Sequence, residues 1–305
     1  MVKNHISESL GDRAFNIINN VLMFLFLLIM FYPLYFTVII SVSDINEVGL
    51  GHVFLLPKGF TLEAYRNVFI NKDIWTGYMN SIIYASLGTL YALVIMLPVA
   101  YGLSKKDLFG KNVTTLFFLF TMYFSGGMVP SYILTQKLGL MNTRLVMIVG
   151  PVSVYNMIVT RTYFMTSIPS DIYEAAYIDG ASEWRSFFNI ALPLAVPVIS
   201  VMALYFAVGS WNSCFNAMLY INNKKLFPLQ LVLRNILILG QEMMMNREYF
   251  SSLSGDEQAI VMARARLAES MKYALIFIAS APLLIAYPFV QKYFVKGIMI
   301  GSLKG

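Results

Sequence analysis

Long apolar runs constrain the fold of this chain more than any other feature of its sequence. A bilayer core about 30 Å thick requires about twenty apolar residues in a helix to cross it, and backbone polar groups there must be paired within the protein. The overall composition, 58% hydrophobic and 12% charged, agrees with that environment. We therefore predict an all-α integral membrane protein with six transmembrane helices, at residues 16–42, 78–103, 113–128, 145–161, 193–219 and 273–290.

The distribution of lysines predicts the orientation of these helices. The short loop 104–111 contains Lys105, Lys106 and Lys111, whereas the opposite short loop 129–142 contains only Lys137. Because short cytoplasmic loops are enriched in Lys and Arg, the lysine-rich loop is expected inside. The first run is longer than a signal-peptide core, so we predict that it is retained. The predicted organisation is a cytoplasmic N-terminal tail (1–15), a six-helix transmembrane domain (16–292) and a cytoplasmic C-terminal tail (293–305). The transmembrane domain has external segments 43–77 and 212–272 and a cytoplasmic loop 169–192.

The polar stretch 171–197 lies between two of the apolar runs and contains several residues typical of helix boundaries. Asp171 and Glu174 have the spacing of a capping box, which predicts a helix start. Gly180 follows Asp179 and can adopt the left-handed conformation that ends a helix. The pattern predicts a short helix that stops at this glycine.

A second short helix is predicted after the glycine. Ser182 is a good N-cap, and Trp184, Phe187 and Phe188 supply an apolar face. Pro193 suits the first turn of the long helix that follows, where its missing N–H costs nothing. We expect two short helices bent at Gly180 between two membrane spans.

Glu174-Ala175-Ala176, followed by Gly180 and Ile190-x-Leu192-Pro193, resembles the EAA loop of permease subunits of bacterial ABC importers. In that family the loop is cytoplasmic and docks on the ATP-hydrolysing subunit. The alternative is an amphipathic loop that rests on the lipid surface. The resemblance implies an ATPase-coupling site at Glu174, Ala175, Ala176, Asp179, Gly180, Ala181, Trp184, Phe187 and Phe188.

Further motifs resemble the carbohydrate-uptake branch of these importers, the maltose-type permeases, and within it the subgroup that serves complex oligosaccharides. They include Asn80-Ser81, Gly126-Gly127-Met128-Val129-Pro130 and Trp211-Asn212. The resemblance implies a type I importer permease in the bacterial cytoplasmic membrane. It further implies a heterodimer with a second, homologous permease, two ATP-binding cassette subunits and an extracellular solute-binding protein.

The chain lacks the sequence motifs of an energy source or a catalytic centre. No Asp, Glu, Lys or Arg lies inside the predicted spans away from their ends, although ion-coupled transporters need a buried ionisable group or a broken-helix cation site. No P-loop, zinc motif or nucleophile elbow is present. Cys214 is the single cysteine, and two isolated histidines form no metal set. We predict no enzyme activity and no cofactor in this chain, with ATP and Mg²⁺ bound by partner subunits.

Polar and aromatic residues near the span ends are candidates for the substrate path. A sugar is recognised by aromatic stacking and directional hydrogen bonds without a fixed charge. Anchoring at the membrane interface or bonding between helices explains the same residues, and both interpretations stay open. The candidates are Asn80, Tyr84, Tyr155, Asn156, Trp211 and Asn212.

Three alternatives to a sugar importer follow from the same sequence. A secondary transporter or facilitator would work without an ATPase, and the missing coupling charge argues against it. An integral-membrane enzyme would need a catalytic constellation. An ABC permease for a non-sugar solute would share the fold.

The external segment 212–272 is either a surface for an external partner or a lid on its own helices.

Overall fold

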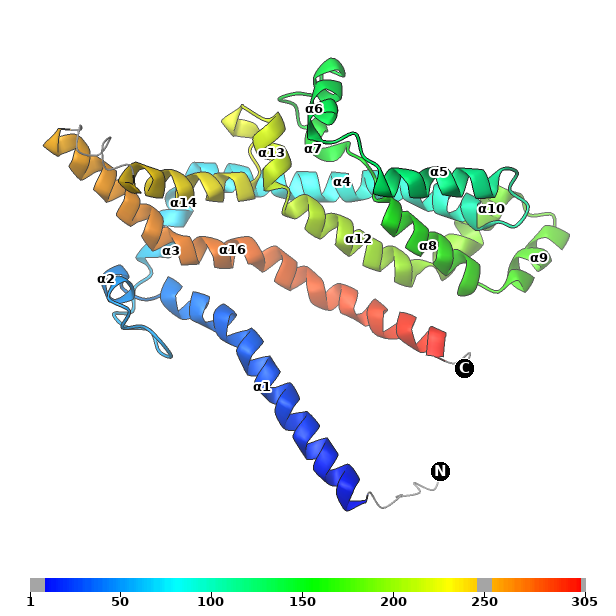
Figure 1. Ribbon diagram of the computed structural model, residues 1–305, viewed down its shortest axis with the longest axis horizontal. Helices are drawn as coiled ribbons and strands as arrows, with labels where there is room; N and C mark the ends of the chain where they lie inside the picture. Colours follow the sequence, from blue (N-terminus) through cyan, green and yellow to red (C-terminus); the bar gives the residue numbers. More distant parts are fainter. Residues whose placement is uncertain (1–8, 246–253, 303–305) are drawn as a thin grey trace. The chain divides into compact units, whose positions relative to one another are not determined.

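The computed structural model describes residues 9–245 and 254–302, and these residues form helices and connecting loops without a strand (Figure 1). The all-α prediction is therefore confirmed for this part of the chain. Two compact units divide the chain: Met1–Ile70 with Leu237–Ile278, and Asn71–Ile236 with Ala279–Gly305. Each unit is described by itself.

The first unit includes α1 (Leu10–Ser41), which covers the first predicted span except for its last residue, Val42. A capping box starts it, because Ser9 Oγ accepts the Asp12 N–H at 3.1 Å and the Asp12 carboxylate accepts the Ser9 N–H at 3.2 Å. Nearly all of its apolar side chains are exposed, as expected for a helix facing lipid or another subunit. Its last turn packs on Val53 and Tyr273. Two short helices follow, α2 (Ile45–Gly49) and α3 (Glu63–Ile70).

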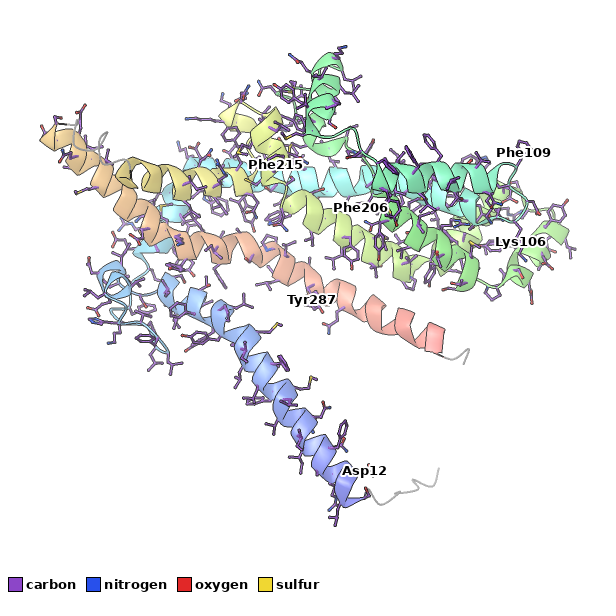
Figure 2. All side chains as sticks on the ribbon, in the orientation of Figure 1. Asp12, Lys106, Phe109, Phe206, Phe215 and Tyr287 are labelled. Atoms are coloured by element: carbon purple, nitrogen blue, oxygen red, sulfur yellow. The ribbon has the colours of Figure 1, made fainter. Side chains whose placement is uncertain are left out.

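The second unit is built around α4 (Lys72–Ser104), against which α8 (Val154–Thr166) and α12 (Val196–Trp211) pack. Small residues at the contacts, including the fully buried Ala100, Ala191 and Ala195, let the backbones approach closely. α5 (Lys111–Tyr123) packs on α8. The loop between α4 and α5 exposes Phe109 completely (Figure 2).

The third predicted span is not one straight helix. α5 ends at Tyr123, and α6 (Met128–Lys137) begins after a break and is bent by 110° from it. The cause is local: Gly126 and Gly127 interrupt the run, and Gly127 has a φ of +85°.

The fourth predicted span is also interrupted. α7 (Leu145–Ile148) is one short turn, residues 149–153 are not helical, and α8 starts only at Val154. Gly150 and Pro151 lie in this break and explain it, because both residues disfavour a continuing helix. Ser153 caps α8 by accepting the Asn156 N–H at 3.3 Å.

The fifth predicted span begins later and ends earlier than expected. Pro193 lies in the short α11 (Leu192–Leu194), which a 79° bend at Ala195 separates from α12. Pro197, rather than Pro193, occupies the first turn of the long helix, so that prediction was wrong. α12 ends at Trp211, and α13 (Cys214–Tyr220) follows as a separate helix.

The last predicted span lies within α16 (Gly255–Ser302), which is one long helix. The predicted tail 293–305 is helical as far as Ser302. The predicted helix after Pro228 is α14 (Leu229–Met245), preceded by a short 3₁₀ turn η2 (Lys224–Leu226). Ser254 starts α16 by accepting the Glu257 N–H at 3.4 Å.

Within the described residues, three helices are long and apolar enough to span a membrane, and up to five spans result if each bent pair counts as one. The count of six stays a prediction.

Candidate functional site

The segment 169–192 forms two short helices, as the sequence predicted, and we call it the two-helix segment. Its first helix, α9 (Ser170–Ile178), begins at Ser170 with Pro169 as N-cap. The predicted capping box between Asp171 and Glu174 is not formed, because the helix starts earlier and places Asp171 inside the first turn. Asp171 instead accepts a hydrogen bond from Ser170 Oγ at 3.3 Å. A carboxylate there still favours the helix through the helix dipole.

The bend at Gly180 is confirmed. The Gly180 N–H donates to Tyr177 O at 3.0 Å and the Ala181 N–H donates to Ala176 O at 2.9 Å, the pair of bonds that closes a helix in a Schellman motif. Gly180 has a φ of +73°. A side chain at this position would impose the strain of the left-handed region.

The second helix begins after Ser182, whose Oγ accepts the Arg185 N–H at 3.3 Å, as predicted. α10 (Glu183–Ser186) continues as a π-helical stretch, η1 (Phe187–Ala191), into α11. A π-helical turn rotates the side chains relative to an α-helix and is frequent at functional sites. Here it directs Phe187 and Ala191 into the core.

An aromatic cluster fixes the two-helix segment to α4 and α8. The buried Phe187 ring lies 5.1 Å from the ring of Tyr101, and Tyr101 lies 5.8 Å edge-on from Phe164. Tyr173 of α9 lies 6.1 Å from Tyr101. Such pairs add about 0.5–1.5 kcal/mol each beyond burial of area. The cluster makes a continuous packed connection between both short helices and the end of α4.

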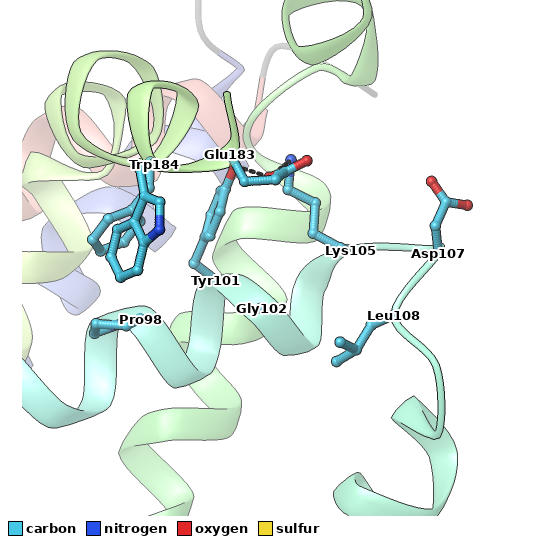
Figure 3. Close-up of a pocket in the computed structure, with 9 residues that line it drawn as sticks. Pro98, Tyr101, Gly102, Lys105, Asp107, Leu108, Glu183 and Trp184 are labelled. Carbon is cyan, nitrogen blue, oxygen red and sulfur yellow. Dashed lines mark hydrogen bonds and ion pairs between the residues drawn. The ribbon is translucent and has the colours of Figure 1, made fainter. Parts of the chain in front are cut away.

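Polar contacts reinforce this connection (Figure 3). Lys105 Nζ lies 3.0 Å from Glu183 Oε2, and the Tyr101 hydroxyl donates to the same oxygen at 3.1 Å. The ammonium also lies 4.3 Å from the centre of the Tyr173 ring, a cation–π distance. Burial of the side chain, and to a smaller extent the nearby Tyr101, raises the pKa of Tyr173 to about 12.

Sequence analysis missed Tyr101, Tyr173 and Glu183 as parts of this site. It used Lys105 only for orientation. The charges of Lys105 and Glu183 were visible, but 78 positions separate them, and no local pattern pairs them.

Four large side chains of the two-helix segment are exposed. Ile178 is 83% exposed, Tyr177 80%, Trp184 69% and Phe188 55%. Trp184 and Phe188 stack with ring centres 6.0 Å apart. We call these four residues the exposed apolar face. A pocket of about 370 Å³ lies beside it, lined by Pro98, Leu108, Trp184 and Phe187 among others.

The residues predicted for coupling divide between two sides of the segment. Ala176 and Phe187 are buried and Ala181 is half-buried. Glu174, Ala175, Asp179, Gly180, Trp184 and Phe188 are exposed.

Two of the predicted path residues are buried and bonded. Asn80 Nδ2 donates to Lys225 O at 2.8 Å and to Phe227 O at 3.1 Å. The Tyr84 hydroxyl donates to Leu226 O at 2.9 Å. These bonds favour the structural alternative for both residues, in which they tie α4 to the η2 turn.

The other predicted path residues differ in exposure. Trp211 is buried and donates its Nε1–H to Ala279 O at 3.1 Å. Tyr155 and Asn212 are exposed, and Asn156 is half-buried. The structure therefore does not bring the six candidates together into one pocket lined by all of them, and their place in a substrate path stays a prediction.

Residues 74–300 match the family model of the binding-protein-dependent transport system inner membrane component. The chain belongs to this family. The permease is 33% identical over 295 residues to the polygalacturonan/rhamnogalacturonan transport system permease protein YtcP of Bacillus subtilis (strain 168), covering 96% of this chain and 99% of that protein. It is 39% identical over 273 residues to protein LplC of the same organism, covering 88% of each chain.

A solved structure agrees. The permease matches a chain in the crystal structure of a bacterial ABC transporter involved in the import of the acidic polysaccharide alginate. The TM-score is 0.81 at 33% identity, over 94% of this chain and 99% of that one. The resemblance to importer permeases is thereby confirmed.

Family membership defines the class of activity. The permease is a multi-pass component of the cell membrane and works in an ABC importer with another permease, an ATPase and a binding protein. It is a membrane-path component rather than a catalytic subunit.

Proposed function

We propose that this permease forms half of the translocation path for an oligosaccharide that an extracellular binding protein delivers. In this proposal the chain crosses the membrane six times, with both termini in the cytoplasm. It pairs with one homologous permease, and two ATPase subunits dock beneath. The permease itself binds no cofactor, because ATP and Mg²⁺ belong to those subunits.

The coupling role is supported by the exposed apolar face, because it lies on a segment that packs firmly on α4 and α8. An isolated exposed Leu needs no explanation, but a contiguous group of large apolar side chains marks an interaction surface. Trp184 and Phe188 stack into such a group, and the exposed Tyr177 and Ile178 lie at the end of α9, just before the bend. The lysine bias predicts that this segment is cytoplasmic. We propose that this face docks into a groove on the ATPase.

The coupling site has two layers in this proposal. Glu174, Ala175, Asp179, Gly180, Trp184 and Phe188 contact the ATPase, and Ala176, Ala181 and Phe187 hold the two helices in shape. When ATP closes the ATPase dimer, the two-helix segment moves with it. Phe187, Tyr101 and the Lys105–Glu183 pair then pass that movement to α4.

Support for an oligosaccharide comes from the names of the relatives, several of which are saccharide permeases, and from the uncharged span interiors. Polygalacturonan and alginate are acidic polysaccharides, so the cargo class includes charged sugars.

The test is reconstitution. Co-purification from the native membrane is expected to yield a second permease and an ATPase. Proteoliposomes containing that complex, with the binding protein added outside, are expected to accumulate oligosaccharide only with internal ATP. Accumulation by the permease alone would contradict the proposal.

A further inference from the structure

Parts of three predicted spans surround a polar pocket in the second unit, which we call the three-span pocket. It has a volume of about 210 Å³ and is lined by residues of α4, α7, α12 and α13 and by the break between α7 and α8. Every lining residue falls within a predicted span, and none of them is charged. None of the six path candidates from the sequence lines it. The pocket is therefore a polar space at positions where the sequence predicts membrane.

A glycine brings the walls of the three-span pocket together. Gly88 lies midway along α4. A Cβ atom on it would lie 3.2 Å from Ser210 Oγ and 3.8 Å from the backbone oxygens of Met147 and Ile148. Helix α4 therefore approaches α7 and α12 at a point where a glycine fits without displacing Ser210. Gly88 and Ser210 both line the pocket, so this contact fixes part of its wall.

The break between α7 and α8 brings polar backbone groups to the three-span pocket. Gly150, Pro151 and Val152 line it and are not helical. The N–H groups of Gly150 and Val152 donate to no backbone carbonyl in the part of the chain that the structure describes. Irregular backbone at membrane depth is tolerated where it is buried in protein or lines a water-filled cavity. Gly150 and Pro151 are exposed in this chain, which favours a cavity that water can enter.

The side chains of the three-span pocket offer the groups that recognise a sugar. Ser210, Ser213 and Asn216 supply hydroxyl and amide groups. Tyr91 and Phe206, the second of which is labelled in Figure 2, supply aromatic rings. Small-molecule sites combine an apolar lining with a few placed polar groups. Because sites for drug-sized ligands occupy about 300–1,000 Å³, this smaller pocket suits one sugar unit rather than a whole oligosaccharide.

Substrate sites of transporters with interrupted spans lie near the middle of the bilayer, beside the interruption. We propose that the three-span pocket holds one sugar unit of the oligosaccharide during its passage through the permease. The hydroxyl of Ser210, the amide of Asn216 and the N–H groups of the break bind the sugar hydroxyls, and Tyr91 packs on the ring. This inference rests on the proposed function. It assigns to this chain a substrate contact that forms after the binding protein has released its cargo.

The test uses a galacturonate trisaccharide that carries a photoreactive diazirine group. Loaded on the binding protein, it is offered to the whole importer, which is trapped with a non-hydrolysable ATP analogue and illuminated. We expect covalent adducts on this permease within residues 146–152 and 206–216. Unlabelled trisaccharide in about tenfold excess should lower their yield about tenfold, because both sugars compete for one site. Adducts confined to the second permease or to other parts of this chain would overturn the inference. If that importer still accumulates the trisaccharide with ATP, the proposed function remains intact.

A variant that fills the three-span pocket gives an independent readout. Gly209 lines the pocket, and a Cβ atom there would meet no atom within 4 Å, so a leucine can occupy the pocket without a clash. Gly209→Leu is expected to lower ATP-driven uptake of the trisaccharide about tenfold or more, because one extra group in a fitted pocket has an effect of this size. The ATPase rate of the importer should be preserved, which shows that the subunits still assemble.

Gly49→Leu is the matched control for Gly209→Leu. Its Cβ atom would also meet no atom within 4 Å, and Gly49 lies in α2 of the first unit. The control is expected to keep uptake. Full uptake by the Gly209 variant would overturn the inference. Uptake by the native importer without ATP would instead defeat the proposed function.

Discussion

At the scale of single residues, Gly180 carries the geometry of the two-helix segment. Its position was predictable from sequence, because a helix stop followed by a serine cap is a local signal. The capping box predicted at Asp171 does not form for an equally local reason. Pro169 is the N-cap, so the helix already begins at Ser170, before Asp171. The burial of Phe187 was not predictable, because a π-helical stretch sets its direction.

Gly180→Pro is expected to abolish coupling. Proline cannot adopt the φ of +73° and has no N–H for the bond to Tyr177 O. ATP-driven uptake should fall about tenfold or more. Membrane insertion, measured by protease protection, should be preserved. Gly51→Pro is the control, because Gly51 has a φ of +71° and a turn bond to Val48 O in the other unit. Full uptake by the Gly180 variant would refute the role of the bend.

Asn80 gives a second prediction at this scale. Asn80→Ala removes the donor to the partly buried carbonyl groups of Lys225 and Phe227, at a cost of about 1–3 kcal/mol. The apparent Tm of the purified permease should drop by several degrees. Tyr84→Phe, which removes the single bond to Leu226 O, should cause a smaller drop. An unchanged Tm with selective loss of sugar uptake would instead place Asn80 in the substrate path.

At the scale of elements, the sequence located the helices better than their breaks. Apolar runs identified α1, α4 and α12, but residues 149–153 were read as part of a span although Gly150 and Pro151 lie there. A hydropathy average over a window as long as a membrane span includes these few residues with their apolar neighbours and so hides the break. Long-range pairs such as Lys105–Glu183 could not be predicted, because the packing of α10 on α4 creates them.

The connection between α10 and α4 yields the third prediction. Glu183 is 72% exposed, so the ion pair contributes about 1 kcal/mol or less. Lys105→Glu and Glu183→Lys should each lower the sugar transported per ATP hydrolysed about two- to fivefold, and the double exchange should restore much of it. Glu47→Lys, which breaks the exposed pair with His52 at 2.9 Å, is the control and should have no effect. Additive losses in the double exchange would show that the two charges act separately.

At the scale of the whole molecule, the chain has a membrane path but no motif for an energy source of its own. The chain belongs to a family that works in ABC importers, and the two-helix segment, which packs on α4, carries the proposed docking face. The all-helical membrane architecture was predictable because apolar runs extend over the whole chain, whereas the orientation that the charge bias indicates stays a prediction. Apolar runs alone did not predict the bends at α5–α6 and α11–α12, although Gly126 and Gly127 locally account for the first of them.

The most direct test of this account places a photo-crosslinking amino acid at Trp184 in the assembled importer. Trp184 is 69% exposed on the proposed docking face. The account predicts a covalent adduct with the ATPase subunit whose yield changes when ATP is added. It predicts none from Phe60, which is 71% exposed on a segment predicted to be external. An ATPase adduct from Phe60, with Trp184 reacting only with lipid, would contradict it.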